Sequence, residues 1–479
     1  MRNRVTDFLV YRWRYIFGYT FILVAIGIML GVAAFFIPNE LRQGEIDSAL
    51  TSATLGTNAM SPQAVVDLPY HLLQKLSFMA FGVSTFTIKL PSIILGAFTA
   101  LGVFLLIRTW FSANVAVLAT LLTIITSQFL FLSQDGTPLI MFAFLSVWLL
   151  FVATFVTRRK YFGMFWKVLT CLVMAASLYT PMGIYLVLVM LTTALFHPHI
   201  RFLIRKFNRY KISVALALGL AALIPLGYAL YLDSTIAFTL LGIPNGSLDI
   251  IANARTVIES MFGFAAASAG HLVRPLYPLG VALLMAVGLF RILSHRYTAR
   301  SYITISWGFV ILLLALLNPD KVTHFYPVAV ILISYGMIYM IRSWYKIFPR
   351  NPYARVAGMI PLVIFVLAMV TSGVTRYVNT YHNNPDVLAT YSQDLTLFRN
   401  TLSANNATVD TTHVVVTKNE LPFYQLVAKY SKNFTVSIDP VAGKTTTVAS
   451  RDATKPAAAP HAIVVNSRAS QADRFYIYK

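Results

Sequence analysis

The side chains best suited to chemistry gather in one polar stretch, Pro38–Ser92, which lies between two long apolar segments. Its acidic and basic members are Glu40, Arg42, Glu45, Asp47, Asp67, Lys75 and Lys89. A carboxylate can accept a proton from a reacting group, and a cation can stabilise a developing negative charge. Because connections between packed membrane helices are usually short, a stretch of this length is expected to fold over a site.

Glu45 and Asp47 are alternative candidates for the acid that faces the site. If residues 45–55 are helical, side chains two positions apart point in nearly opposite directions, so only one of the two acids can face a site. Glu40 is a third candidate. For each of them, the alternative is a solvated loop carboxylate without a chemical role.

Further candidates lie near the ends of later apolar segments. Asp135 is in Ser133–Pro138, where a carboxylate at membrane depth needs a partner or a task, although an Asp-Gly turn explains it equally well. Lys89 begins the second apolar segment, where a lysine can also extend to the membrane surface without binding anything. No two His or Cys residues have ligand spacing, so we expect no metal cofactor, with a divalent ion left open.

Composition decides which elements position these residues. Hydrophobic residues make up 57% of the 479 residues and charged residues 11%, with a mean hydropathy of +0.69, which excludes an ordinary soluble domain. The net charge of +21 could indicate nucleic acid, but the basic residues form short clusters between apolar segments. That arrangement is typical of helix orientation in a membrane, so we expect no nucleic-acid partner.

A membrane helix needs about 20 apolar residues, and this rule predicts about eleven spans. They run approximately over 15–37, 87–107, 112–132, 137–157, 165–179, 182–196, 212–232, 275–293, 301–317, 323–341 and 356–374. The sequence therefore predicts an all-α multi-pass domain over 1–375, with outer loops at 38–86 and 233–274. The second of these loops contains a predicted amphipathic helix, Leu248–Phe262, at the outer interface.

Loops rich in Arg and Lys alternate with loops that contain few of them along the whole chain, and this pattern predicts how the helices are oriented in the membrane. We expect the N-terminus in the cytoplasm, no cleaved signal and, with an odd number of spans, an extracytoplasmic tail from about Arg376. The single cysteine, Cys171, lies in an apolar segment and is expected to be a small buried hydrophobe.

The tail, residues 376–479, is predicted to be a small α/β domain. Strands are expected at Thr412–Thr417, Asn433–Ile438, His461–Val465 and Phe475–Tyr478, and helices at Val387–Leu402 and Glu420–Tyr430. The Ala-, Thr- and Pro-rich stretch from about Gly443 to Pro460 is expected to be flexible.

Several motifs resemble a known family. They are Val66-Asp67-Leu68-Pro69-Tyr70-His71-Leu72-Leu73, Phe81-Gly82-Val83-Ser84 and Ile88-Lys89-Leu90-Pro91-Ser92, with weaker likeness in Leu178–Gly183 and Lys321–Pro327. In this order they resemble the membrane glycosyltransferases of the C-type (GT-C) fold, in the branch of protein O-mannosyltransferases and aminoarabinose transferases. The resemblance covers roughly residues 1–345 and leaves the tail uncovered.

The resemblance implies a GT-C fold and transfer of a sugar, with inversion, from a polyprenyl-phosphate donor to a cell-envelope acceptor, lipid or protein. The family carries an aspartate-glutamate pair in the first outer loop, and Glu45 matches its glutamate. On that match we favour Glu45 as the general base. Gly44 stands where the family has aspartate, so the pair is incomplete.

For the leaving phosphate, the resemblance implies cations at helix mouths. Lys89 stands where the family usually has arginine, and Lys321 with His324 lies where relatives place a phosphate-binding arginine. Arg274 and His271 could face the same anion. Each is also explained as a structural polar group at a helix end.

Two other functions remain open. A flippase or transporter of lipid-linked sugars would use charges inside the membrane, but the charges singled out above lie at helix ends and no internal repeat is evident. A catalytically inactive GT-C scaffold is favoured by Gly44, Lys89 and His324, which depart from the family pattern. The sequence identifies neither the sugar nor the acceptor.

Overall fold

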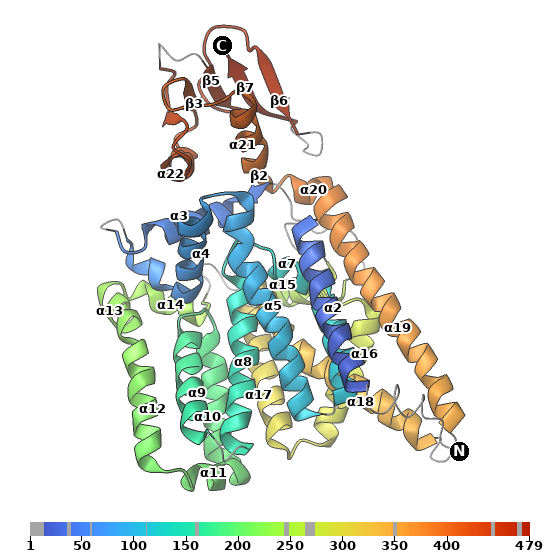
Figure 1. Cartoon of the computed structure of the whole chain (residues 1–479). Helices are drawn as coiled ribbons and strands as arrows, with labels where there is room; N and C mark the ends of the chain where they lie inside the picture. Colours follow the sequence, from blue (N-terminus) through green and yellow to red (C-terminus); the bar gives the residue numbers. More distant parts are fainter. Residues whose placement is uncertain are drawn as a thin grey trace.

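The protein is described by a computed structural model that covers residues 14–35, 40–57, 60–111, 113–158, 162–243, 249–263, 274–347, 352–441, 446–466 and 472–479. Most of the described chain is helical, and the helices form one bundle with a small β-sheet beyond one end (Figure 1). Each apolar segment singled out in the sequence is helical for most of its length.

The bundle is built from long and short helices. The long ones are α2 (Arg14–Phe35), α5 (Thr85–Trp110), α8 (Leu139–Arg158), α17 (Ala299–Leu317), α18 (Tyr326–Ile347) and α19 (Pro352–Val378). The short ones are α6 (Ala113–Ile124), α7 (Ser127–Leu132), α9 (Gly163–Leu178), α10 (Gly183–Phe196), α11 (Pro198–Arg205), α12 (Arg209–Ala222), α13 (Ile224–Leu232), α14 (Thr235–Leu241), α16 (Leu279–Ser294) and the 3₁₀ helix η3 (Pro319–Phe325).

The expectation of about eleven spans is not confirmed. Within the described residues, five helices are long and apolar enough to cross a membrane, or up to seven if each bent helix pair is one span. The difference arises because several predicted segments are short or broken. The segment predicted at 112–132, for example, is divided into α6 and α7.

The first outer loop folds into helices. It contains β1 (Leu41–Arg42), α3 (Gln43–Thr54), the 3₁₀ turn η2 (Pro62–Val65) and α4 (Leu68–Phe81), and α3 and α4 lie across the end of the bundle that faces the sheet (Figure 1). One face of α4 is apolar and exposed, as expected for a helix at a membrane surface. The amphipathic helix predicted in the second outer loop is present as α15 (Ile250–Phe262).

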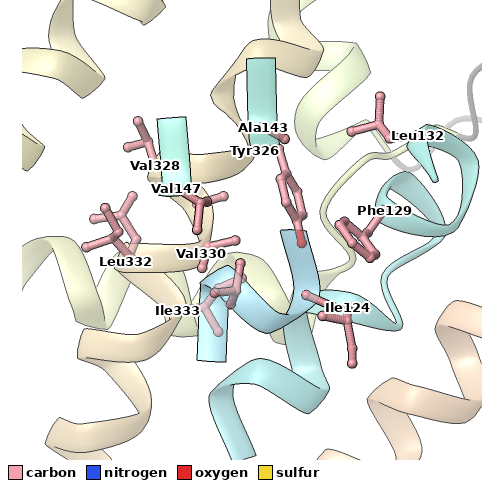
Figure 2. Packing of buried hydrophobic residues seen from close by; sticks show 14 of the residues in the cluster. Ile124, Phe129, Leu132, Ala143, Val147, Tyr326, Val328, Val330, Leu332 and Ile333 are labelled. Atoms are coloured by element: carbon pink, nitrogen blue, oxygen red, sulfur yellow. The ribbon is translucent and has the colours of Figure 1, made fainter. Parts of the chain in front are cut away.

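The bundle core is apolar and tightly packed. Figure 2 shows part of it, where side chains of α7, α8 and α18 meet. The rings of Phe129 and Tyr326 stack at 5.4 Å, and the Tyr326 hydroxyl donates to the Thr123 carbonyl at 3.0 Å. This packing fixes the end of α7, and therefore the turn after it, which carries Asp135.

The tail contains a five-stranded sheet of order β4-β3-β5-β7-β6. The strands are β3 (Thr412–Val415), β4 (Thr435–Ser437), β5 (Thr446–Ser450), β6 (Ala462–Val465) and β7 (Asp473–Tyr478), and the helices are α21 (Leu395–Ala404) and α22 (Leu421–Ser431). Four strands, β3, β4, β6 and β7, and the second helix lie close to the predicted positions. The extent of the domain, 376–479, stays a prediction.

Two expectations for the tail are wrong. The stretch predicted to be flexible contains β5, the central strand of the sheet, because Thr446–Val448 are β-branched and favour extended backbone. The helix predicted at Val387–Leu402 is interrupted by β2 (Tyr391–Gln393), which pairs antiparallel with β1. The 3.6-residue spacing of apolar side chains does not reveal this strand, since its partner is far away in sequence.

The tail and the first outer loop share one apolar core. Ile46, Phe78 and Ile88 from the helices beneath the sheet pack in the same cluster as Phe398 and Phe423 from the tail. Together with the β1–β2 pairing, this cluster fixes Tyr391 beside the polar residues of the first loop.

Candidate functional site

Glu45 lies at the centre of the site and is fully buried. Its Oε1 atom accepts a hydrogen bond from the Gly136 amide at 2.7 Å, and Oε2 accepts one from the Arg42 amide at 2.9 Å. Lys89 Nζ is 3.4 Å from Oε1. These three donors complement an ionised carboxylate, which makes Glu45 a side chain that can carry a negative charge away from water.

Lys89 reaches Glu45 from the first turns of α5 and is 1% exposed. Its ammonium also lies 3.4 Å from the Glu40 carbonyl and 5.6 Å from the centre of the Tyr391 ring. A lysine presents a compact, rotatable charge rather than a planar fork, so it can exchange one anionic partner for another.

A second ion pair lies beside the first. The Arg42 guanidinium binds Asp135 Oδ1 and lies 5.4 Å from the centre of the Phe131 ring, and the Thr137 hydroxyl donates to Asp135 Oδ2. Burial lowers the pKa of Arg42, but the negative charges of Asp135 and Glu45 raise it above its ordinary value. The outer loop is thus tied to the turn after α7 by a buried pair of opposite charges.

Gln74 holds the surrounding elements in register. Its Oε1 accepts hydrogen bonds from Ser48 at 3.1 Å and Ser52 at 2.6 Å, both on α3. Its Nε2 donates to the carbonyls of Ile88 at 2.9 Å and Gly136 at 3.1 Å. One buried amide therefore links α3, α4, α5 and the Asp135 turn, the four elements that surround Glu45.

The close approach of Gly136 to Glu45 makes a testable prediction. A Cβ atom on Gly136 would lie 2.8 Å from Ile88 Cγ2 and 3.1 Å from Glu45 Oε1. We expect Gly136→Ala to displace the Glu45 carboxylate and to cost about 1–3 kcal/mol of stability through overpacking. The measurements are the melting temperature in detergent and the rate of sugar transfer.

Gly44→Ala is the matched control, because a Cβ atom at Gly44 would meet only Thr137 Cγ2, at an ordinary 3.7 Å. Gly44 lies in the first turn of α3, so alanine is expected to be neutral or stabilising there. Equal effects of the two substitutions would mean that Gly136 has no special relation to Glu45.

A second cluster of polar residues surrounds Asp67. This residue is buried and precedes α4 in the left-handed conformation, with φ of 53°. Its amide donates to the Tyr179 carbonyl at 2.8 Å, while Oδ1 accepts no hydrogen bond from the part of the chain that the structure describes. Lys321 is close enough to act on its charge. Burial raises the pKa of Asp67 to about 7, although Thr180 and Lys321 lower it in part.

This shift predicts that stability falls as pH rises. The pKa of Asp67 is about 7 in the folded chain and 3.8 for a free side chain, so between these values the folded protein holds a proton that the unfolded chain has lost. Folding then weakens by about 1.4 kcal/mol per pH unit, and the loss is complete above about pH 7.

Asp67→Asn should flatten the dependence of melting temperature on pH between 5 and 7. Asp47→Asn, at an exposed acid, should keep the wild-type slope, and an unchanged slope in Asp67→Asn would contradict this assignment.

Tyr70 lies close enough to interact electrostatically with carboxylates of both clusters, Glu45 and Asp135 in the first and Asp67 in the second. Burial raises its pKa well above the ordinary value, its hydrogen bond with Ser92 lowers it, and Asp135, Glu45 and Asp67 raise it further. The Tyr70 and Ser92 hydroxyls are 2.9 Å apart, and Ser92 also bonds to the Asp135 carbonyl.

The structure brings together Glu45, Lys89 and Asp135 from the predicted set. Asp47 is exposed and bonds to Gln43 at 2.9 Å, as the two-residue spacing from Glu45 requires. Lys321 lies near Asp67 instead, and its neighbour His324 is buried with its ring 4.5 Å from that of Phe142.

The other predicted residues lie away from Glu45 or outside the residues that the structure describes. Arg274 is half-buried, before Pro275. His271 lies outside the described residues. The Glu40 side chain is buried and bonds to Asn466 of the tail, which also donates to Asp394 at 3.1 Å.

Sequence reasoning assigned no role to Arg42, Gln74 or Tyr391. Arg42 had one usable signal, since a buried carboxylate such as Asp135 requires a cation and Arg42 was a basic residue in the same outer region. Gln74 and Tyr391 gave none, because their roles depend on contacts between distant segments.

This architecture defines a class, the GT-C glycosyltransferase fold. ArnT from Cupriavidus metallidurans bound to undecaprenyl phosphate superposes with a TM-score of 0.57 and 12% identity, over 95% of this chain and 97% of that one. The Archaeoglobus fulgidus oligosaccharyltransferase tethered with an acceptor peptide gives 0.53 and 12% identity, over 88% of this chain and 64% of that one. At such low identity, the likeness establishes the fold alone.

Within that class, residues 68–228 match the family model described as dolichyl-phosphate-mannose-protein mannosyltransferase. This match extends from the start of α4 into α13, so it includes Lys89 and Asp135 but not Glu45. The predicted GT-C fold is thereby confirmed, and so is the resemblance to O-mannosyltransferases over these residues. No curated protein sequence matches the chain.

Proposed function

We propose that this protein is an inverting glycosyltransferase that moves a sugar from a polyprenyl-phosphate donor to a cell-envelope acceptor, lipid or protein, on the outer face of the membrane. The observation that carries the proposal is the buried Glu45–Lys89 ion pair, which places an acid and a movable cation 3.4 Å apart in a GT-C fold. The reaction needs one group of each kind.

In the proposed reaction, an acceptor hydroxyl oxygen attacks the anomeric carbon of the donor sugar from the face opposite the phosphate. Glu45 accepts the hydroxyl proton as the new carbon–oxygen bond forms. The bond from the anomeric carbon to the phosphate oxygen breaks, and its electron pair leaves with the phosphate. One displacement of this kind inverts the configuration of the sugar.

Lys89 couples donor binding to the activation of the base. In the structure, Lys89 forms an ion pair with Glu45. A lipid phosphate would compete for the same ammonium, and when Lys89 turns toward the phosphate, Glu45 loses its cationic partner and becomes a stronger proton acceptor. Arg42 and Asp135 neutralise each other and keep the surroundings of Glu45 fixed during this exchange.

The placement of the other partners is also part of the proposal. Lys321, His324 and Arg274 are further candidates for contacts with the donor, and the tail is a candidate for contact with the acceptor. Orientation follows the basic loops, with the N-terminus in the cytoplasm and Glu45 at the outer end of the bundle. The ArnT relative bound to undecaprenyl phosphate and the oligosaccharyltransferase with an acceptor peptide support a lipid-linked donor and a separate acceptor.

The test uses the purified full-length protein in vesicles with radiolabelled polyprenyl-phosphate sugars and an envelope extract as the source of acceptor. The proposal predicts label in a new glycosidic product that depends on both donor and protein. Movement of labelled lipid between leaflets without a product would indicate a flippase. Neither activity, together with no thermal shift on donor addition, would indicate an inactive scaffold.

A further inference from the structure

Two adjoining cavities open at the end of the bundle opposite Glu45. Their volumes are about 540 Å³ and 180 Å³, and they share Trp110, Thr298 and Arg300 in their walls. Trp110 is the last residue of α5, whereas Lys89 is near its first, and a helix of 26 residues is about 39 Å long. The cavities are therefore remote from the proposed transferase site.

The smaller cavity is strongly basic. Arg291, Arg300, Arg342 and His295 contribute to its walls, and none of the described residues that line either cavity is acidic. In sequence, Asp320 is the only acid between Arg291 and Arg342, and it lies in η3, beyond the far end of α17. Positive charges gathered without an acid attract an anion from outside the chain.

Aromatic and backbone contacts hold part of this cluster in place. Arg300 donates to the Trp110 carbonyl, and its guanidinium lies 5.7 Å from the centre of the Phe111 ring. Arg291 lies 5.7 Å from the centre of the Tyr339 ring. The helices α5, α16, α17 and α18 thus fix a pocket for a negatively charged group before that group arrives.

The larger cavity is mostly apolar. Its walls come from α8, α10, α11 and α17 and include Leu150, Val156, Met190, Ile200, Leu203, Phe207 and Ile303. One wall, α11, turns by 86° from α10 and lies across the end of the bundle, with Phe202 exposed (Figure 1). A short amphipathic helix in this position is typical of a membrane surface.

We propose that the two cavities form one binding site for an anionic phospholipid of the leaflet opposite the transferase site. The phosphate headgroup would bind among the three arginines, and an acyl chain would occupy the apolar cavity. Basic pockets between membrane helices bind acidic headgroups in this way. The apolar cavity beside the basic one is the reason to choose a lipid over a free phosphate. The proposal is independent of the sugar-transfer reaction.

The experiment measures the melting temperature and lipid retention of the purified full-length protein in detergent. The probes are phosphatidylglycerol, phosphatidylcholine and inorganic phosphate, and retained lipid is counted by native mass spectrometry. We expect phosphatidylglycerol to raise the melting temperature and to remain bound, while phosphatidylcholine and phosphate do neither.

The variant pair is matched in charge. Arg291→Gln/Arg342→Gln removes two charges from the pocket and leaves Arg300, which holds α5, in place. Arg201→Gln/Arg205→Gln removes two exposed charges from α11 that do not line either cavity. The first variant should bind phosphatidylglycerol about tenfold more weakly or worse, and the second should bind like the wild type.

Three results would overturn the proposal. Equal stabilisation by phosphatidylcholine would mean that charge is not recognised. Equal stabilisation by inorganic phosphate would indicate a free-anion site without a lipid. Equal loss in both double variants would mean that the positive surface acts as a whole and that the pocket is not specific.

Discussion

Glu45→Gln is expected to lower the turnover of sugar transfer by about 10²- to 10⁴-fold, the usual contribution of a general base. Glutamine has nearly the same shape, and its side-chain oxygen can still accept the Gly136 amide hydrogen that Glu45 Oε1 accepts at 2.7 Å. What it cannot do is take the proton of an incoming hydroxyl. The loss should therefore appear in kcat.

Binding of the donor should survive this substitution. In the wild type, Lys89 is paired with Glu45, so a donor phosphate must compete with that carboxylate. Without the negative charge at position 45, this competition is removed and the phosphate can bind Lys89 more readily. We expect the thermal shift caused by a polyprenyl-phosphate sugar to be equal to or larger than that of the wild type, which would separate lost chemistry from lost folding.

Asp47→Asn is the comparison that decides between the two acids of α3. Asp47 is exposed and only two residues away, so its loss should leave turnover close to that of the wild type. Turnover lost in Asp47→Asn and kept in Glu45→Gln would move the base to Asp47. Turnover kept in both would remove α3 from the mechanism and leave Glu40 as the remaining candidate of the first loop.

The helices and the burial of only one of these two acids were accessible from the sequence, because both depend on local periodicity. Long apolar runs predicted nearly all helices of the bundle, and the spacing of Glu45 and Asp47 predicted that only one would be buried. The family match added the expectation that Glu45 and Lys89 share a site. Each of these conclusions uses residues close in sequence or a pattern already known as a unit.

The rest of the site depends on contacts between residues far apart in sequence, which produce no recognisable pattern in the local sequence. Asp135 is 93 positions from Arg42, and a turn aspartate before glycine explains it equally well until the partner is known. Tyr391 reaches the site through the pairing of β1 with β2, two strands of two and three residues. Strands this short carry no recognisable alternation, so their pairing depends on the packing of the tail against the first loop.

The span count was not confirmed, for a physical reason of a different kind. Apolar composition shows that a helix is surrounded by apolar material, but it does not distinguish lipid from other helices. The segment Pro319–Ile347, which contains α18, is mostly buried inside the bundle, whereas Ile360–Asn383, which contains most of α19, is mostly not, although both are apolar. Breaks such as the one between α6 and α7 also leave an apolar run intact while shortening the helices.

The Arg42–Asp135 pair is expected to produce the largest stability effect in the site. Asp135 is 3% exposed and Arg42 is 9% exposed, so removing either partner leaves a buried charge without compensation. Such a loss costs about 3–5 kcal/mol, against about 1 kcal/mol for an ordinary substitution. Asp135→Ala and Arg42→Met should therefore each lower the melting temperature strongly, as measured in detergent by intrinsic fluorescence.

The double variant Arg42→Met/Asp135→Ala separates the charge from the packing. With both charges removed, no buried ion is left unpaired, so the double variant should be less destabilised than the sum of the two single variants. The Arg42 amide still donates to Glu45, because that bond uses the backbone and survives the substitution. Additive losses would mean that the two side chains stabilise the fold independently of each other.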